Sequence, residues 1–390
     1  MKEVILYSPG AFQPYGHSFD YSKGLAEAFY DLGYVVYVFG FDGPLTFPET
    51  IKEERRSKKN TATAKKTFTQ KVKWGVSRLF SSGGILQEFT SFYSTFKTKP
   101  LVIFETFEYF SLSRVVPAFS SNYFCVFHDT NFNFVQTSFI AGLYKYLAKI
   151  PSRRIVKHSI TSFVHGSQMR TNFIVQMGKK YEDKIKAIPY GAPLPEEINE
   201  EVRLASKKEM GLKTDKHYLL SFGTLRSDKE YEPILEALGN TQDWFWMVAG
   251  PEGDYSYARI KDLAKQYNVE EKLITYPRFI KNTEQKLFFT AADLVINLYK
   301  PFIRHESGTA QLARTYNMPV VAGGPPDLTN YVAERNIGWV TDSKQNVTEI
   351  LTLFQKIDAH EKAIIYSNIK TLAESNSWPR VVDYILGYLT

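Results

Sequence analysis

The sequence predicts an α/β protein of two domains, each built on a parallel β-sheet with helices around it. Three observations predict this fold. The chain has 390 residues, and a single hydrophobic core rarely extends beyond about 250–300 residues. Short apolar runs rich in β-branched and aromatic residues alternate with amphipathic helical patterns. A Pro-rich and then strongly charged stretch, 192–208, separates two series of this kind and is the predicted linker.

The first series opens with a strand at 3–8 and a Gly/Pro-rich loop. An amphipathic helix follows at 19–33, where Gly33 suits the position after a helix end. With the next strand at 34–40 this makes a βαβ unit, whose strands are parallel. Further strands of this series are expected at 100–105, 123–129, 160–167 and 185–191.

The second series repeats the alternation, without any sequence repeat of the first. Its strands are expected at 217–223, 244–250, 272–279, 293–299, 318–324 and 338–341, and its helices at 284–292, after Ser307 and at 347–357. We place the boundary between the two domains at 195/196.

The bulk composition is that of a soluble globular protein, with 44% hydrophobic and 23% charged residues. The net charge of +7 and pI of about 9.0 favour anionic partners such as nucleotides, phosphates, acidic lipid or nucleic acid. A single cysteine, Cys125, excludes an internal disulfide framework and fits a reducing compartment. The N-terminal apolar run is too short for a signal peptide, and no run approaches the roughly 18 apolar residues that span a bilayer. We therefore expect a cytoplasmic protein.

A basic segment, 49–80, interrupts the first series with ten Lys or Arg against three Glu. Trp74 lies opposite a helical face shared by four apolar residues: Phe68, Val72, Val76 and Leu79. Two interpretations stay open. The segment is a solvated basic excursion, or it is a docking surface for acidic lipid at the inner face of a membrane or for a lipid-linked acceptor.

Residues that follow the strands are the candidates for ligand binding, because open parallel sheets bind ligands outside the carboxyl ends of their strands. After the first strand, Gly16 permits a close approach of a phosphate, although such a loop is also a common tight turn. His128 ends the strand at 123–129 and either faces the ligand or is structural. Asp129 after it suits a helix N-cap.

Gly223 ends the first strand of the second series, and Arg226 and Lys229 precede a helix. Two cations three residues apart suit a diphosphate, because Arg chelates two oxygens and Lys adds a compact charge. The alternative is a surface pairing with Asp228 and Glu230.

Ser307 and Gly308 stand before a short helix, whose first N–H groups have no partner inside the helix. These groups carry the positive end of the helix dipole, about half a charge, and so suit an anion. A plain N-cap is the alternative.

Taken in order, these motifs resemble the retaining glycosyltransferases of the GT-B fold, family GT4. The resemblance covers most of the chain and is strongest from Gly223 to Trp339. It is carried by "PYGHS", "FHD", "IPYG", "FGTLRSDK", "VAGPEGDY", "ADLVINLY" and "SGTAQLARTYNMPVVA". "NSWPRVVDYILGYL" near the end is similar to the last helix of the family, which returns to the first domain.

The resemblance implies two Rossmann-like domains that face each other across a cleft holding a nucleotide sugar. Residues 1–195 with the returning helix 376–390 would form the acceptor domain, and 196–375 the donor domain. The implied reaction moves a sugar from a UDP- or GDP-linked donor to a hydroxyl of a glycan or a lipid-linked acceptor. No cofactor is expected besides this donor substrate.

The resemblance also implies roles for individual residues. Arg226 and Lys229 would grip the donor diphosphate, with Gly16 and Gly223 beside it. His128 would lie near the reacting carbon of the sugar.

Further along the chain, Ser307, Gly308 and Thr309 match the turn over the phosphates and the sugar. Glu306 would touch sugar hydroxyls. The run Arg278, Phe279 and Ile280 would line the nucleobase pocket, largely with backbone.

One position departs from the pattern of the family. Many members carry Glu-x7-Glu, whose second Glu binds the ribose. Here Leu312 stands at the second position and Arg304 at the first, so the usual ribose contact is in doubt.

The implied mechanism retains the anomeric configuration by a front-face route, in which the leaving diphosphate helps to deprotonate the acceptor. Such a route needs no pair of carboxylates of the glycosidase kind. The sequence holds no Asp-x-Asp, the usual metal clamp of the GT-A glycosyltransferases. We therefore expect no metal, and stabilisation of the leaving group by the cations and the helix front.

Three rival functions stay open. A nucleotide-sugar 2-epimerase of the same fold would need acid–base groups, for which Glu105, Glu108 and Asp129 are candidates. A non-catalytic glycosyltransferase-like binding scaffold would fit the missing second Glu. Nucleic-acid binding is raised by the pI, but no motif supports it.

Overall fold

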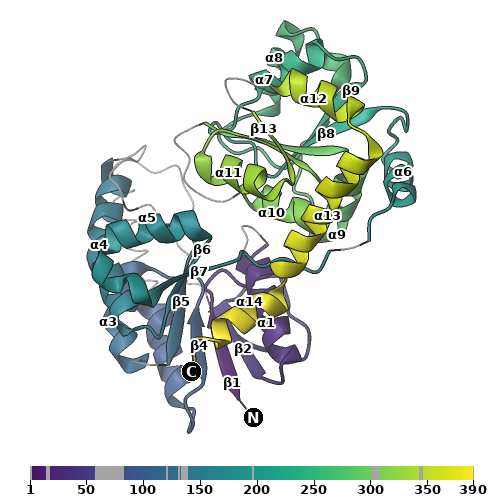
Figure 1. The fold of residues 1–390 in the computed structure, drawn as a ribbon. Helices are drawn as coiled ribbons and strands as arrows, with labels where there is room; N and C mark the ends of the chain where they lie inside the picture. The colour runs from purple at the N-terminus through teal and green to yellow at the C-terminus, as the bar shows by residue number, and fades with distance from the viewer. Residues whose placement is uncertain are drawn as a thin grey trace. The chain divides into compact units, whose positions relative to one another are not determined.

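The computed structural model describes residues 2–14, 18–57, 83–119, 122–130, 132, 139–195, 197–300, 307–341 and 346–389. They divide into two compact units (Figure 1). Unit 1 comprises Met1–Gly191 and Trp378–Thr390, and unit 2 comprises Ala192–Ser377. The boundaries that the sequence predicts, 195/196 and 375/376, lie within a few residues of these.

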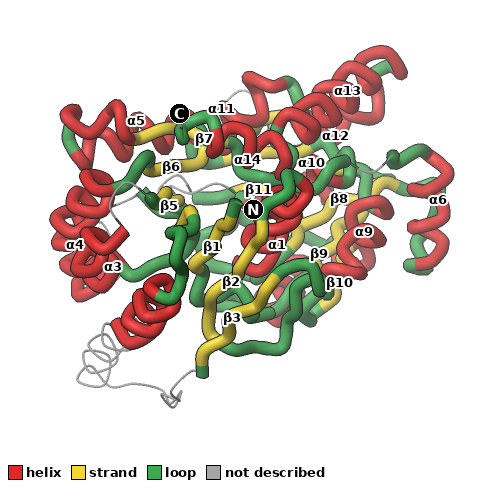
Figure 2. The backbone as a smooth tube through the Cα atoms, turned by 90° about the horizontal axis from the view of Figure 1, so that it is seen from below, coloured by secondary structure: helices red, strands yellow, loops and turns green. Residues whose placement is uncertain are grey.

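Unit 1 is built on a seven-stranded parallel sheet with the order β3-β2-β1-β4-β5-β6-β7, whose strands lie side by side in Figure 2. Its strands are β1 (Glu3–Tyr7), β2 (Val35–Phe41), β3 (Lys52–Arg56), β4 (Leu101–Phe104), β5 (Tyr123–Phe127), β6 (Ser162–His165) and β7 (Ile185–Ile188). Its helices are α1 (Ser18–Asp31), a helix at 83–94, α3 (Tyr109–Val115), α4 (Phe139–His158), α5 (Ser167–Met177), α14 (Trp378–Leu386) and the 3₁₀ turns at Val116–Phe119 and Lys179–Lys184.

Both faces of this sheet are covered, which is why its central strands are apolar throughout. Alternate residues of β1 enter different cores, as the twofold period of a strand requires. Val4 and Leu6 pack in the core that contains α1 and α14, whereas Ile5 and Tyr7 pack in the core that contains the helix at 83–94.

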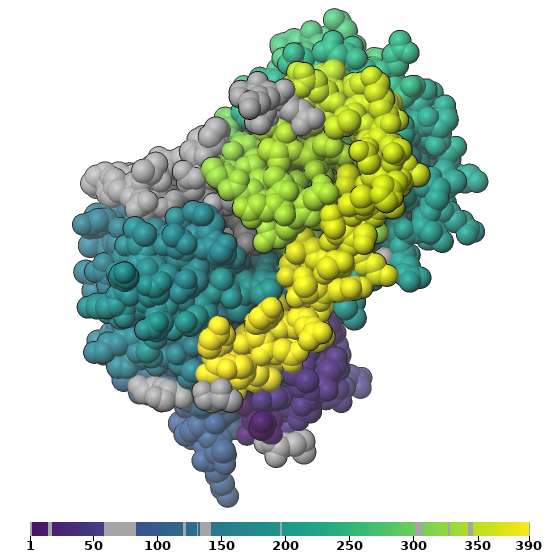
Figure 3. All heavy atoms as spheres, viewed as in Figure 1, coloured from purple at the N-terminus to yellow at the C-terminus, as the bar shows by residue number. Residues whose placement is uncertain are grey.

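The C-terminal helix belongs to unit 1, as the sequence predicts. In Figure 3 this yellow helix lies on the surface of the unit beside the purple N-terminal segment. The indole ring of Trp378 packs closely against two glycines of the unit. A Cβ added to Gly24 would lie 2.1 Å from the ring, and a Cβ added to Gly191 would lie 2.2 Å from it. The ring of Trp378 therefore needs a glycine on each side.

Unit 2 is built on a six-stranded parallel sheet with the order β10-β9-β8-β11-β12-β13. Its strands are β8 (His217–Phe222), β9 (Trp244–Ala249), β10 (Leu273–Tyr276), β11 (Leu294–Leu298), β12 (Val320–Gly323) and β13 (Gly338–Val340). Its helices are α6 (Glu200–Glu209), α7 (Glu232–Gly239), α8 (Tyr257–Gln266), α9 (Asn282–Ala291), α10 (Gly308–Thr315), α11 (Pro326–Arg335), α12 (Val347–Lys356), α13 (Ala359–Ser375) and the 3₁₀ turn Glu270–Lys272.

The prediction of two parallel-sheet α/β domains is confirmed, but two stretches differ from their expected state. The second half of the predicted linker is α6, which Asn199 caps at its start. Part of the basic segment, Lys52–Arg56, is the edge strand β3, on which Arg55 lies over the ring of Phe12. The remainder of the predicted basic surface, from residue 58 on, lies outside the described residues.

Candidate functional site

The residues predicted to hold the diphosphate follow two neighbouring strands of unit 2. The order of its sheet places β8 beside β11, although β9 and β10 lie between them in the chain. At such a reversal of strand order the connections leave in opposite directions, and open parallel sheets bind ligands there. Residues 223–229 follow β8, and residues 307–309 belong to the connection after β11.

Gly223 turns the chain at the end of β8 with a φ of 91°. Its N–H donates to the carbonyl of Ala249 at 2.9 Å. A Cβ on Gly250, which follows β9, would lie only 2.2 Å from the carbonyl oxygen of Gly223. Glycines at both positions therefore let the two backbone segments pass in direct contact at the carboxyl edge of the sheet.

Lys229 lies beside the end of β11 because the loop after β8 pairs with the end of that strand. The N–H of Glu230 donates to Leu298 at 3.0 Å, and that of Lys300 donates to Asp228 at 2.9 Å. Nζ of Lys229 points back to the carbonyl oxygen of Phe222, the last residue of β8, at 3.4 Å. Burial and the charge of Arg226 lower the pKa of Lys229 to about 8, against the opposing effect of Asp228.

The front of α10 reaches the same carbonyl group. Oγ1 of Thr309 donates to the carbonyl oxygen of Phe222 at 3.2 Å. Ser307 caps the helix by accepting from the N–H of Ala310, and its hydroxyl lies 3.3 Å from that of Tyr299. No described atom lies within 4 Å of a Cβ placed on Gly308. The ammonium of Lys229 and the first turn of α10 therefore meet at the end of β8.

Arg226 is paired with an acidic side chain in this structure. Its guanidinium donates to both carboxylate oxygens of Asp228, with Nε and Nη2 each 3.0 Å from an oxygen. It also lies 6.0 Å from the centre of the Tyr299 ring. The ion pair that was the alternative interpretation is thus present for Arg226, whereas Lys229 contacts a backbone carbonyl.

The predicted nucleobase residues follow β10, at the edge of the same sheet. Arg278 forms an ion pair with Glu284 through Nη2 at 2.6 Å and Nη1 at 2.9 Å. The ring of Phe279 is 52% exposed, whereas Ile280 is buried in the core. An exposed ring beside a sheet edge suits stacking on a base, so the nucleobase assignment stays a prediction.

Two predicted site residues, Gly16 and Glu306, lie outside the described residues, as does Arg304. Leu312, at the position of the missing Glu, packs against the core of unit 2. Its side chain is thus a packing residue and supplies no polar contact.

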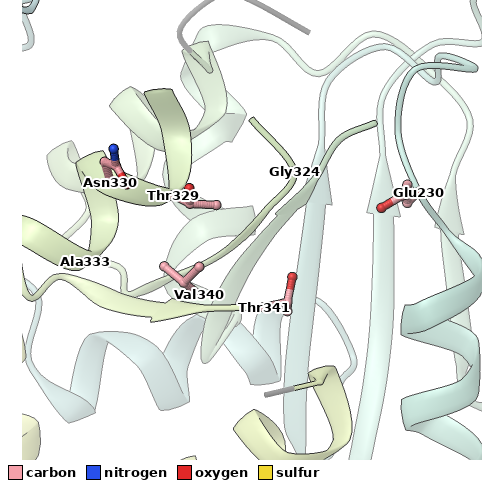
Figure 4. A pocket seen from close by; sticks show the side chains of 7 residues that line it. All are labelled: Glu230, Gly324, Thr329, Asn330, Ala333, Val340 and Thr341. Atoms are coloured by element: carbon pink, nitrogen blue, oxygen red, sulfur yellow. The ribbon is translucent and has the colours of Figure 1, made fainter. Parts of the chain in front are cut away.

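A hollow of about 520 Å³ lies at the ends of β12 and β13. Glu230 borders it on one side, and Thr329 and Asn330 of α11 lie opposite (Figure 4). Gly324, Ala333, Val340 and Thr341 complete its lining. It adjoins the loop of Lys229, but none of the predicted site residues that the structure describes lines it.

In unit 1 the strand order reverses between β1 and β4, and a buried polar cluster lies at the ends of these strands. Glu105, directly after β4, accepts a hydrogen bond from Ser22 of α1. Ser8, directly after β1, bonds to Thr106 at 3.2 Å. Burial raises the pKa of Glu105 to about 7, against the hydrogen bonds from Ser22 and Ser8 that lower it.

His128 connects this carboxyl group to a second histidine. Nε2 of His128 lies 3.7 Å from Oε1 of Glu105. Its Nδ1 lies 3.2 Å from Nε2 of His165, the last residue of β6. The ring of Tyr21 packs edge-on against His128, with the ring centres 4.7 Å apart. Both ring nitrogens of His128 therefore face polar partners within unit 1, which fixes the orientation of the ring.

Sequence reasoning did not single out His165 or Ser22 as site residues. The signal for His165 was present, because it ends a predicted strand just as His128 does. Ser22 lies in the second turn of α1, and only the fold shows which strand end that turn approaches.

Glu108 and Asp129 have other partners. Glu108 caps α3 and accepts from the hydroxyl of Tyr144 at 2.7 Å. Asp129 forms an ion pair with Lys145 of α4. Within the described part of the chain, no cluster of three or more His, Cys, Asp or Glu residues could hold a metal ion.

Solved structures with the same fold match the chain over nearly its full length. A sucrose-phosphate synthase from Thermosynechococcus elongatus has a TM-score of 0.74 at 14% identity, covering 99% of this chain and 98% of its own. HepE from Anabaena, in complex with UDP and glucose, has a TM-score of 0.66 at 13% identity, covering 100% and 99%. WaaG, a glycosyltransferase involved in lipopolysaccharide biosynthesis, has a TM-score of 0.61 at 13% identity, covering 99% of both chains.

The family comparison concerns unit 2. Residues 202–366 match the family model described as glycosyl transferases group 1. Most of unit 2 thus forms a group 1 glycosyltransferase domain. The search of curated proteins finds no match to the chain. The expected GT-B fold is confirmed, and the matched range contains Gly223, Lys229 and Ser307–Thr309 of the candidate site. Among its described residues, none of the helices has the length and apolar character needed to span a bilayer.

Proposed function

We propose that this glycosyltransferase moves a sugar from a nucleoside diphosphate sugar to the hydroxyl of a glycan or a lipid-linked acceptor in the cytoplasm. The observation that carries the proposal is the meeting of Lys229 and the first turn of α10 at the carbonyl oxygen of Phe222. A cation and a helix front at one point suit a diphosphate, since both complement negative charge. The Anabaena neighbour has been solved with UDP and with UDP-glucose, which makes a UDP-linked sugar the first donor to test.

In this proposal the second unit stabilises the leaving group. The bond between the anomeric carbon and the diphosphate oxygen breaks, and negative charge gathers on the diphosphate. Lys229, when protonated, and the N–H groups at the front of α10 neutralise this charge in a partly buried site. The acceptor oxygen bonds to the anomeric carbon on the face that the diphosphate leaves, and its proton passes to the diphosphate. The configuration of the sugar is thereby retained.

The first unit supplies the polar cluster around His128, which the family resemblance assigns to the neighbourhood of the reacting carbon. We assign Glu105 as a positioning residue, because its carboxyl group faces Nε2 of His128 while His165 faces Nδ1. An ionised Glu105 favours a proton on Nε2. His128 would then present a ring of fixed orientation to the substrate.

The epimerase alternative loses two of its three carboxylates. Glu108 caps α3 and Asp129 pairs with Lys145, so only Glu105 lies in the histidine cluster. The scaffold alternative predicts donor binding without turnover.

A two-stage experiment separates these functions. A thermal-shift screen over UDP-, GDP- and ADP-sugars identifies the donor, because a bound ligand raises the unfolding temperature by mass action. NMR of the donor incubated with and without candidate acceptors then detects the product. Transfer with retained anomeric configuration supports the proposal. An epimer formed without acceptor, or binding without any turnover, contradicts it.

A further inference from the structure

Helix α4 of unit 1 presents an unusual outward face. Four large apolar side chains on it are exposed to solvent: Leu143 (40%), Tyr146 (55%), Leu147 (43%) and Ile150 (69%). Their spacing places them on one side of the helix over two turns. No other helix in the described part of the chain exposes four such side chains. Apolar side chains gathered in this way mark an interaction surface.

The same face continues with cations. Arg154 and Lys157 are exposed on the following turns. Nζ of Lys149 lies 5.2 Å from the centre of the Tyr146 ring. The helix, FIAGLYKYLAKIPSRRIVKH, contains no Asp or Glu. An apolar stripe therefore runs into a stripe of positive charge that no acid within the helix neutralises.

The opposite face of α4 is already occupied. Ala148, Ile155 and Val156 are fully buried, and the helix packs against α3 and α5 at the side of unit 1 (Figure 1). Arg153 ties it to the end of α5, with Nε donating to the carbonyl of Met177 at 2.9 Å. The exposed stripe is thus the outer side of a firmly packed helix.

We propose that this face of α4 docks the protein on the surface of a membrane rich in anionic lipid. Apolar side chains enter the boundary between headgroups and acyl chains, while Lys and Arg beside them bind lipid phosphates. A second copy of the chain fits less well, because a symmetric contact would set the same cations against each other with no acid on the helix to separate them.

The position of α4 relates the docking to the proposed function. The helix follows β5, so its first turns lie at the sheet edge where His128 and Glu105 lie. The hydroxyl of Tyr144 bonds to Glu108, and Lys145 pairs with Asp129, in the segments that follow β4 and β5. At 1.5 Å per residue, the apolar stripe from Leu143 to Ile150 is about 10 Å long. A docked helix would hold the lipid surface beside the polar cluster, where a lipid-linked acceptor would need to arrive.

Vesicle sedimentation tests the docking directly and does not depend on transfer activity. The probes are vesicles of phosphatidylcholine alone and of phosphatidylcholine mixed with phosphatidylglycerol. We expect the wild type to sediment with the mixed vesicles and much less with the neutral ones. Leu147→Gln with Ile150→Gln should weaken this binding more than tenfold, because it removes two large apolar side chains from the contact with lipid. Arg154→Gln with Lys157→Gln should weaken it more than tenfold, at about fivefold per cation.

Matched variants on unit 2 control for general changes of the surface. Leu353→Gln with Ile364→Gln removes two exposed apolar side chains elsewhere, and Lys261→Gln with Lys265→Gln removes two exposed cations. Neither pair should change vesicle binding, and thermal unfolding checks that every variant is folded.

The proposal is overturned if the wild type does not distinguish the two kinds of vesicle, or if the α4 variants bind as the wild type does. Loss of binding only on deletion of residues 58–82 would assign the membrane contact to the basic segment instead. Concentration-dependent dimerisation that the α4 variants abolish, without vesicle binding, would make α4 a contact between copies. Failure of sugar transfer would leave the vesicle result unchanged.

Discussion

Lys229 carries a charge whose presence depends on pH within the range where enzymes are assayed. Burial and the neighbouring Arg226 lower its pKa to about 8. A bound diphosphate would favour the protonated form and raise this pKa again. The affinity for UDP should therefore be constant below pH 8 and fall above it, by up to tenfold per pH unit for one proton.

Calorimetric titration of UDP between about pH 6.5 and 9.5, on either side of the lowered pKa, checks this prediction. Lys229→Ala should bind UDP more weakly near neutral pH and lack the decline above pH 8. An identical decline in the wild type and the variant would show that another group is responsible.

Glu105 gives the second prediction at the scale of a residue. Its pKa is raised to about 7 by burial, and its ionised form favours a proton on Nε2 of His128. The rate of UDP release from a UDP-sugar should therefore rise with pH through about 7 in the wild type. Glu105→Gln keeps the shape of the side chain but cannot ionise, so this rise should disappear and kcat/KM should fall by about 10².

The same substitution should also change the pH dependence of stability. This second measurement separates a positioning role of Glu105 from a merely structural one. A carboxyl group with a raised pKa destabilises the folded state increasingly between its unfolded value of 4.5 and about 7. Glu105→Gln should remove this part of the pH dependence of thermal unfolding. A variant that loses stability at all pH values and keeps the kinetic pH profile would contradict the positioning role.

The sequence predicts well which residues lie at the strand ends. Gly223, Lys229 and Thr309 follow strands, and the structure places all three at the end of β8. Spacing alone does not determine side-chain pairing, so the sequence cannot decide between a free Arg226 and the ion pair with Asp228 that the structure shows. The contact of His128 with His165 joins positions 37 residues apart, and only the order of the strands brings them together.

At the scale of elements, the return of α14 to unit 1 depends on two glycines that flank Trp378. Gly24 lies inside α1, where alanine would ordinarily stabilise a helix by about 1 kcal/mol. Here the added methyl group would collide with the indole ring. We expect Gly24→Ala to destabilise the fold by about 1–3 kcal/mol.

Urea unfolding measures this effect, and Gly84→Ala is its matched control. Gly84 lies in the helix at 83–94, and no atom of the described residues lies within 4 Å of a Cβ added to it. The control should be close to neutral or slightly stabilising. A stabilising effect of both substitutions would mean that Trp378 does not pack as described.

The sequence predicts helices and strands well where the hydrophobic periodicity is strong, and less well where charged residues mask this periodicity. The buried strands of both sheets lie where the apolar runs predict them. The sequence predicts only a basic segment at β3, because this edge strand is rich in charged residues. Its arginines lie over the rings of Phe12 and Phe39. The charged half of the predicted linker is the amphipathic helix α6, whose Arg203 and Lys207 are buried by partners distant in sequence.

At the scale of the whole molecule, the net charge of +7 fits two anionic partners with separate surfaces. We propose Lys229 and the front of α10 on unit 2 for a diphosphate, and the cationic stripe of α4 on unit 1 for lipid. The two surfaces lie on different units, so substitutions in one should leave binding at the other unchanged.

The central claim is that Lys229 and the front of α10 hold the diphosphate of the donor. Calorimetric titration with UDP and with uridine tests it most directly, because the two ligands differ only in the diphosphate. The wild type should prefer UDP strongly, and Lys229→Ala should lose a factor of about 10–10² of that preference while its affinity for uridine stays the same. Lys265 is an exposed lysine of the same unit, and the control variant Lys265→Ala should behave as the wild type. An undiminished preference for UDP in Lys229→Ala would contradict the account.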